Sequence, residues 1–123
     1  MIGGIWRDYP SIISYMNINK VKVFSKKNIP FKIQNNIEEL CSIIEESPVV
    51  AEVDGHREVI GFVKDCYSRF GDVYGNVYIY PRYYEYNQIN VTNLEINFDY
   101  GDKNDYIIIK YVVIYVEKML DKK

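Results

Sequence analysis

The sequence predicts a single α+β domain whose core is an antiparallel β-sheet. Several short segments alternate apolar and polar residues, which is the pattern of strands with one buried face. Asp54-Gly55 stands between two such segments and is typical of a hairpin turn, because both turn positions need a positive φ. The chain has 123 residues, of which 48% are hydrophobic, so residues 1–123 are long enough to form one domain with one core.

The first quarter of the chain is expected to contain an arm and two strands. Residues 1–19 include two adjacent glycines and the apolar anchor Trp6, and we expect an irregular arm that docks on the domain or on a neighbouring subunit. Residues 20–25, KVKVFS, alternate polar and apolar side chains and predict the first strand. Residues 29–34, IPFKIQ, continue in the same style and predict a second one.

Residues 36–46 are predicted to form the internal helix. Asn36 stands three residues before Glu39, which is the spacing of a capping box. Pro48 ends the helix, because the residue before a proline is pushed out of the helical region. One apolar face is formed by residues spaced three and four apart: Ile37, Leu40, Cys41 and Ile44.

The rest of the sheet is predicted from apolar or alternating segments separated by turn residues. Asp54-Gly55 joins the first two of these segments, and Gly71-Asp72 is expected to form the next turn. The predicted strands are residues 48–53, 57–68, 73–80 and 94–100.

The last segment, residues 105–120, carries two conflicting signals. Its β-branched residues favour a strand. Lys110 and Glu117 are seven residues apart and fall on one helical stripe, and Asp105 could cap a helix. We expect a C-terminal helix over residues 105–120.

The composition argues against several classes of function. The formal net charge of −2 argues against binding of duplex nucleic acid, which normally needs a basic surface. No run of about twenty apolar residues is present, so we expect no membrane-spanning helix. Cys41 and Cys66 fit no metal-site spacing and are expected to be reduced thiols in a cytoplasmic protein.

The sequence also lacks a catalytic motif. No serine stands in a G-x-S-x-G context, and His56, the only histidine, has no evident third group to orient it. The acidic residues between Asp99 and Asp105 lack the spacing of a calcium loop. We therefore expect no enzymatic activity, no metal and no cofactor.

Residues 73–87, VYGNVYIYPRYYEYN, contain six tyrosines. In a strand, alternate side chains face opposite sides, so the valines and Ile79 share the core face while Tyr74, Tyr78 and Tyr80 share the other. Tyrosine combines an apolar ring with a polar tip, so this second face is expected to meet a partner. A packed helix or a dimer contact is the alternative to a ligand platform.

Three of the four arginines fall between residues 57 and 82, among aromatic residues. Guanidinium groups bind phosphate, rings stack on a nucleobase, and asparagine amides bind ribose or the adenine edge. The alternative for each arginine is a solvated turn position. The candidate ligand-binding residues are Arg57, Arg69, Phe70, Tyr80, Arg82, Tyr83, Tyr84, Asn87 and Asn93.

Residues 48–80 resemble the phage prohead-protease fold in three successive segments, PVVAEVD, EVIGFVKD and VYGNVYI. In that family the first strand ends in a catalytic His-Asp pair, whereas this chain has Val53-Asp54 at the matching place. The family also needs a downstream serine, and no serine follows Ser68. The resemblance implies a related fold or a capsid role without proteolysis.

The small size, the tyrosine- and asparagine-rich composition and the cluster VDGHREVIGF…CYSRFG…YPRYYEYN resemble the phage Thoeris anti-defence proteins. Those proteins sequester signalling isomers of cyclic ADP-ribose. The resemblance implies a homo-oligomer that holds a small nucleotide-derived ligand near a subunit interface in the host cytoplasm, without cleaving it. The alternative is a phage structural or protein-interaction module, capsid-associated or a host-protein inhibitor, that uses the tyrosine-rich face.

Overall fold

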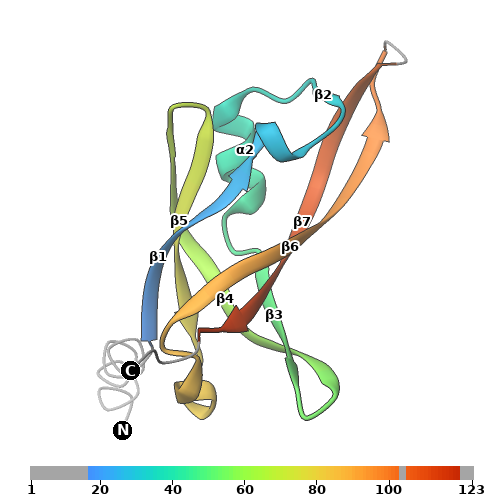
Figure 1. Cartoon of the computed structure of the whole chain (residues 1–123). Coiled ribbons are helices and arrows are strands. Elements are labelled where there is room, and N and C mark those ends of the chain that lie inside the picture. The colour runs from blue at the N-terminus through green and yellow to red at the C-terminus, as the bar shows by residue number, and fades with distance from the viewer. Residues whose placement is uncertain (1–16, 103–104, 120–123) are drawn as a thin grey trace, which may run out of the picture.

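The computed structural model describes residues 17–102 and 105–119. Its helical segments are the short 3₁₀ turns η1 (Lys26–Asn28) and η2 (Pro81–Tyr86) and the helix α2 (Ile37–Ile44). Its strands are β1 (Asn17–Ser25), β2 (Lys32–Ile33), β3 (Pro48–Val53), β4 (His56–Arg69), β5 (Asp72–Ile79), β6 (Ile89–Tyr100) and β7 (Tyr106–Lys118). They form one sheet in the order β1-β5-β4-β3-β7-β2, with β6 also paired to β7, and the sheet curls into a half-barrel (Figure 1).

This architecture confirms the predicted α+β class with a β-sheet core and one internal helix. The Asp54-Gly55 hairpin is also confirmed, since both residues have a positive φ. Of the predicted arm, residues 1–16 lie outside the described residues, and residues 17–19 belong to β1.

The predicted capping box forms at the start of α2. The Asn36 side chain accepts a hydrogen bond from the Glu39 backbone N–H at 2.8 Å, and the Asn36 backbone N–H donates to Glu39 Oε1 at 2.8 Å. The helix buries Leu40 and Ile44 completely. It therefore contributes its apolar stripe to the core and leaves its acidic first turn in solvent.

Three expectations about the secondary structure are wrong. Residues 106–118 form the strand β7 and not a C-terminal helix, because pairing with β6 along its length satisfies the backbone of this β-branched segment. The strand expected over residues 29–34 is reduced to β2. The second hairpin turn lies at Phe70-Gly71, one residue earlier than expected, since these two residues have a positive φ.

The charged residues that suggested a C-terminal helix have other roles. Lys110 forms an ion pair with Asp99 of β6 at 3.7 Å, and Asp105 forms one with Lys32 at 3.7 Å. These pairs are exposed and lie between neighbouring strands, not along one helical face.

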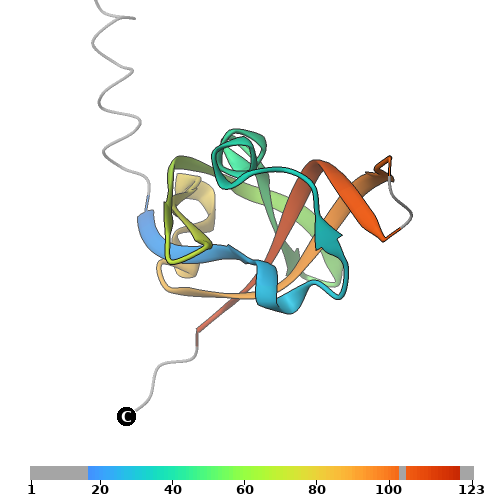
Figure 2. The ribbon, with the colours of Figure 1, turned by 90° about the horizontal axis from the view of Figure 1, so that it is seen from above.

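Helix α2 fills a gap in the sheet. Strand β3 is short and pairs with β7 only at Val49 and Val50, so β4 and β7 separate beyond it, and α2 packs between them (Figures 1 and 2). Asn35 completes the edge of β7 in this gap. Its side-chain Nδ2 donates to the Ile109 carbonyl at 3.3 Å and its Oδ1 accepts from the Ile109 N–H at 2.7 Å.

The core lies on the concave face of the half-barrel. Val73, Val77 and Ile79 of β5 are fully buried there, whereas the tyrosines of the same strand point outward, as predicted. Gly61 of β4 lies directly against the backbone carbonyl of Tyr78, so a side chain at this position would overlap it. No helix in residues 17–102 and 105–119 is long and apolar enough to span a bilayer.

Candidate functional site

The convex side of β1, β5 and β4 carries an outward row of apolar and aromatic side chains. The strand register places Ile18 opposite Tyr78, and Tyr78 opposite Phe62. The register also places Tyr74 opposite Tyr67 two levels further along, beyond Asn76. We call this surface, Ile18, Phe62, Tyr67, Tyr74 and Tyr78, the aromatic face.

The rings of the aromatic face stack on one another. The ring centroids of Phe62 and Tyr78 are 5.3 Å apart with planes at 3°, and those of Tyr67 and Tyr74 are 5.6 Å apart with planes at 16°. Each ring already uses one flat side on its neighbour, which leaves less ring face free for a further stacked ring. Such a surface is better suited to pack against a protein than to accept a stacked nucleobase.

Polar groups on the same surface are already hydrogen-bonded. Tyr78 donates its hydroxyl to Asp65 Oδ2 at 3.3 Å, and the Asn76 amide donates to the same oxygen at 3.1 Å. Burial and the neighbouring Asp65 carboxylate raise the pKa of Tyr78, so its hydroxyl keeps its proton at neutral pH. Lys64 forms an ion pair with Glu46 at 2.9 Å.

The aromatic face remains open within the described part of the chain. Ile18 is 51% exposed and Tyr67 is 46% exposed. A shallow hollow of about 280 Å³ on this surface is lined by Phe62 and Tyr78 together with the polar residues Glu45, Lys64 and Asp65. The predicted tyrosine-rich face therefore exists, and Tyr80 extends it, with its ring centroid 6.0 Å from that of Phe62.

Arg69 and Phe70 lie at the tip of the β4–β5 hairpin. Phe70 has a φ of 54° and is 93% exposed, and the Arg69 guanidinium lies 5.6 Å from its ring centroid. A phenylalanine at positive φ is strained, and neither burial nor packing explains it here. Arg57 stands 12 positions earlier on the same strand, a distance of about 40 Å at the rise of an extended chain.

Five further candidates belong to η2 or its ends, at the opposite end of the half-barrel. Tyr83 is buried and donates its hydroxyl to Glu58 Oε1 at 2.5 Å, and this hydrogen bond raises the pKa of Tyr83. Arg82 lies over the Tyr83 ring, with its guanidinium 5.2 Å from the ring centroid. These contacts close the end of the core. The five residues are Tyr80, Arg82, Tyr83, Tyr84 and Asn87.

Arg57 and Asn93 are brought together from distant parts of the sequence. Both line a hollow of about 350 Å³ between the β3–β4 hairpin and the β6–β7 pair. The Arg57 guanidinium lies 5.2 Å from the ring centroid of Tyr115, whose hydroxyl donates to Glu95 Oε1 at 2.6 Å. This hydrogen bond raises the pKa of Tyr115.

The charge in the Arg57 hollow does not favour a pyrophosphate. Glu52 and Glu117 also line it, so two carboxylates face one guanidinium. Like charges brought together in a partly buried site repel each other. A neutral or hydroxyl-rich ligand fits this hollow better than a multiply charged anion.

In one molecule the candidate residues therefore lie in three separate places: the tip of the β4–β5 hairpin, η2 with its ends, and the Arg57 hollow. Arg57 and Glu58 are neighbours on β4, so their side chains face opposite sides of the strand, and Glu58 is the partner of Tyr83. The Arg57 hollow and the η2 residues thus lie on different sides of the β3–β4 hairpin, and Arg69 with Phe70 is remote from both.

Sequence reasoning missed Phe62 and Tyr115. The Asp54-Gly55 turn sets the register of β3 and β4, and Phe62 was correctly placed on the second of these strands. No local signal shows that Phe62 pairs with Tyr78 of β5. Tyr115 was assigned to a helix, so its position beside Arg57 could not be anticipated.

The two thiols are not activated. Burial is the main cause that raises the pKa of Cys66 to about 12, and burial also raises the pKa of Cys41, so both thiols stay protonated at neutral pH. Among residues 17–102 and 105–119, no three His, Cys, Asp or Glu side chains are arranged to hold a metal ion.

Comparison of the chain with protein-family models, with curated proteins and with solved structures finds no significant match.

Proposed function

We propose that this chain is a non-enzymatic interaction module that binds another protein through the aromatic face. The observation that supports the proposal best is the openness of this surface: Ile18 and Tyr67 are about half exposed, next to stacked rings. Aromatic residues are enriched at protein interfaces because they bury a large apolar area with little loss of conformational entropy. The resemblance of residues 48–80 to the prohead-protease fold favours a capsid-associated partner.

Site-specific photo-crosslinking in the host tests this proposal. A photoreactive phenylalanine analogue at Tyr67 should give a discrete crosslinked species that disappears when the variant Ile18→Ser/Tyr74→Ser carries the same analogue. Tyr111 of β7 is the matched control, because it is 53% exposed and lies outside the aromatic face. Equal crosslinking from positions 67 and 111, or none from position 67, would contradict the proposal.

The second candidate function is sequestration of a nucleotide-derived immune signal, such as a cyclic ADP-ribose isomer, without cleavage. The observation that favours it is that Arg57 and Asn93 line one hollow beside the ring of Tyr115. Because Glu52 and Glu117 oppose a pyrophosphate there, this hollow would hold the base or a ribose of the ligand. For the η2 residues and the tip of the β4–β5 hairpin to contact the same ligand, a second copy of the chain would have to supply them.

Calorimetric titration separates the second candidate from the first. The ligands are ADP-ribose, cyclic ADP-ribose and its glycosidic isomers, and cyclic dinucleotides, each with product analysis after titration. Sequestration requires tight binding of one ligand without turnover and a weaker affinity in Arg57→Ala and Arg82→Ala. If both variants keep the wild-type affinity, the assignment of these arginines is wrong.

A further inference from the structure

The aromatic face begins at the N-terminal end of β1. Asn17 is the first residue of this strand and pairs with Ile79, and the next residue, Ile18, pairs with Tyr78 of the face. Ile18 is about half exposed, so the border of the face is open among the described residues. Residues 1–16 are therefore joined to the domain directly beside an open apolar surface.

Residues 1–16, MIGGIWRDYPSIISYM, are mostly apolar and carry little charge. More than half of them are apolar or aromatic, among them Ile5 and Trp6. Arg7 and Asp8 are the only charged side chains and have opposite signs. So short a segment cannot form a core of its own, and its apolar side chains leave water only by covering another surface.

A segment without net side-chain charge matches the aromatic face, because most charged groups beside the face are already paired. Lys22 forms an ion pair with Asp72 at 3.3 Å, and Lys64 forms one with Glu46 at 2.9 Å. Removing an unpaired charge from water is costly, whereas covering apolar side chains is favourable. The face therefore favours an apolar, neutral occupant over a strongly charged one.

The segment is long enough to reach every ring of the face. The rows at Tyr78 and Tyr74 are four residues apart on β5, or about 13 Å at the rise of a strand. Strand β4 is the second neighbour of β1, which places it about 10 Å away. A chain of 16 residues spans about 50 Å when it is extended. Residues 1–16 can therefore cross the face from β1 to the rings on β4.

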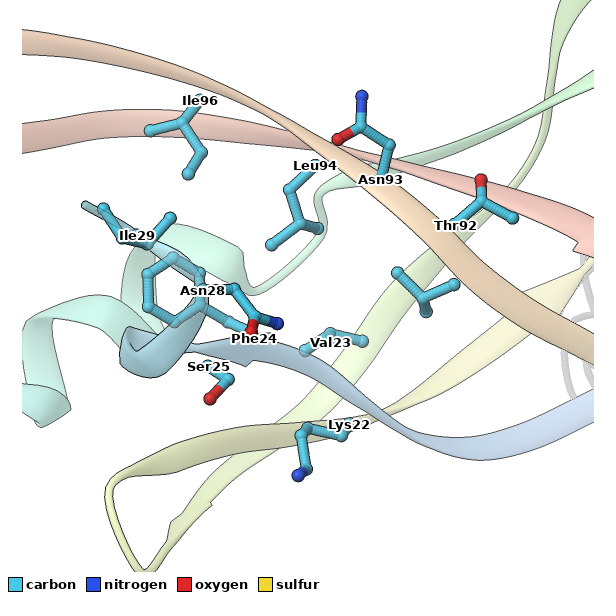
Figure 3. A pocket seen from close by; sticks show the side chains of 11 residues that line it. Lys22, Val23, Phe24, Ser25, Asn28, Ile29, Thr92, Asn93, Leu94 and Ile96 are labelled. Atoms are coloured by element: carbon cyan, nitrogen blue, oxygen red, sulfur yellow. The ribbon is translucent and has the colours of Figure 1, made fainter.

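A second apolar surface borders β1 but lies further from the segment. It is a hollow of about 300 Å³ between β1 and β6, and Val23, Phe24 and Ile29 line it (Figure 3). These residues belong to the C-terminal end of β1 and to the chain that follows η1, whereas the segment joins β1 at its N-terminal end. The aromatic face is therefore the nearer of the two surfaces.

We propose that residues 1–16 cover the aromatic face of the molecule that carries them, and that a partner protein binds this face only by displacing them. A segment tethered at the border of the face competes at an effective concentration on the order of millimolar, whereas a second copy competes only at its own concentration. The covering of the face concerns the chain alone, and the displacement rests on the function proposed above.

Fluorescence of the full chain tests the proposal, because Trp6 is the only tryptophan. Its emission should lie at shorter wavelength than that of N-acetyltryptophanamide in the same buffer, and acrylamide should quench it about threefold less efficiently, since the ring is removed from water. Emission and quenching equal to those of the free amide overturn the proposal. A shift that grows with protein concentration also overturns it, because the occupant is then a second copy.

Paired variants identify the surface that covers Trp6. Ile18→Ser/Tyr67→Ser removes two half-exposed side chains of the aromatic face and should raise the quenching of Trp6 about threefold, because less apolar area holds the segment. Phe31→Ser/Tyr111→Ser removes two similarly exposed side chains elsewhere and should leave the quenching unchanged. Circular dichroism verifies that both variants keep the fold. An equal effect of the two variants, or no effect of the first, refutes the assignment to this face.

Photo-crosslinking from position 67 separates this inference from the proposed function. In the purified chain, the photoreactive analogue should crosslink to a peptide from residues 1–16 within a species of monomer mass, and absence of this product contradicts the covering of the face. In the host, Ile5→Ser/Trp6→Ser should raise the yield of the partner crosslink about threefold, and an unchanged yield contradicts the displacement. A monomer-mass product without any partner crosslink contradicts the function proposed above and supports the covering of the face.

Discussion

Asn35 takes the place of a strand residue beside β7, and its removal should be strongly destabilising. The side chain is 8% exposed and makes two hydrogen bonds to one residue, accepting from the N–H of Ile109 and donating to its carbonyl. Alanine at this position would leave both backbone groups of Ile109 without a partner inside the sheet. Each unsatisfied buried group costs about 1–3 kcal/mol, so Asn35→Ala should lower the free energy of unfolding by about 2–5 kcal/mol.

Urea unfolding followed by circular dichroism measures this loss. A domain of this size has a total stability of about 5–15 kcal/mol, so the midpoint shift should be large. Asn36→Ala is the matched control, because it removes a neighbouring asparagine that only caps α2 in solvent and should cost about 1 kcal/mol. Hydrogen exchange gives a local readout, since the Ile109 N–H should exchange much faster in Asn35→Ala.

The reasoning about Asn35 is wrong if Asn35→Ala loses no more stability than Asn36→Ala. Water would then satisfy the Ile109 backbone in place of the amide. It is also wrong if the Ile109 N–H keeps its wild-type exchange rate while global stability falls, because the loss would then arise elsewhere.

Four further outcomes follow from the fold. Gly61→Ala should destabilise by about 1–3 kcal/mol in urea unfolding, because the added carbon meets the Tyr78 carbonyl, and an unchanged midpoint would contradict the close approach. Phe70→Asn should stabilise the isolated chain by about 1 kcal/mol, because asparagine tolerates a positive φ, and a loss of stability would show a structural role for the ring. Cys66 should react with iodoacetamide at pH 8 about a hundredfold or more slower than an unfolded thiol, because burial raises its pKa to about 12; a comparable rate would exclude that burial. The raised pKa of Tyr83 means that its stabilisation is complete below the unfolded-state pKa of about 10 and is lost as pH rises toward the higher folded-state value. Wild type should therefore lose more stability than Tyr83→Phe between about pH 9.5 and 11, and parallel pH profiles would refute this.

Local signals predicted the parts of the fold that depend on neighbouring residues. The capping box at Asn36 and the hairpin at Asp54-Gly55 are short-range features, and both formed as expected. The alternation in β5 also predicted which side chains enter the core, because that strand has no interruption to its burial pattern.

Strand β7 was missed because its alternation is interrupted. Its register with β6 skips Lys110, so the buried residues are Ile107 and Ile109 before the bulge and Val112 and Ile114 after it. A spacing of two, then three, then two resembles neither an ideal strand nor an ideal helix. The charged stripe then favoured a helix that long-range pairing excludes.

Proximity in sequence was a poor guide to the candidate site. An extended chain rises about 3.3 Å per residue, so Arg57 and Arg69 lie at opposite ends of β4 although both belong to one short segment. Arg57 and Asn93 meet because β3 pairs with β7, a contact between distant residues that no local pattern shows.

The central position of β7 has a consequence for how the chain folds. This strand pairs with β2, β3 and β6, and it follows all of them in the sequence. The hairpins β3–β4 and β4–β5 can close early, since their strands are joined by tight turns. The sheet cannot be completed until β7 has left the ribosome, so the nascent chain leaves the apolar face of β3 in solvent during synthesis. Because these pairings join residues distant in sequence, we also expect slow refolding in vitro.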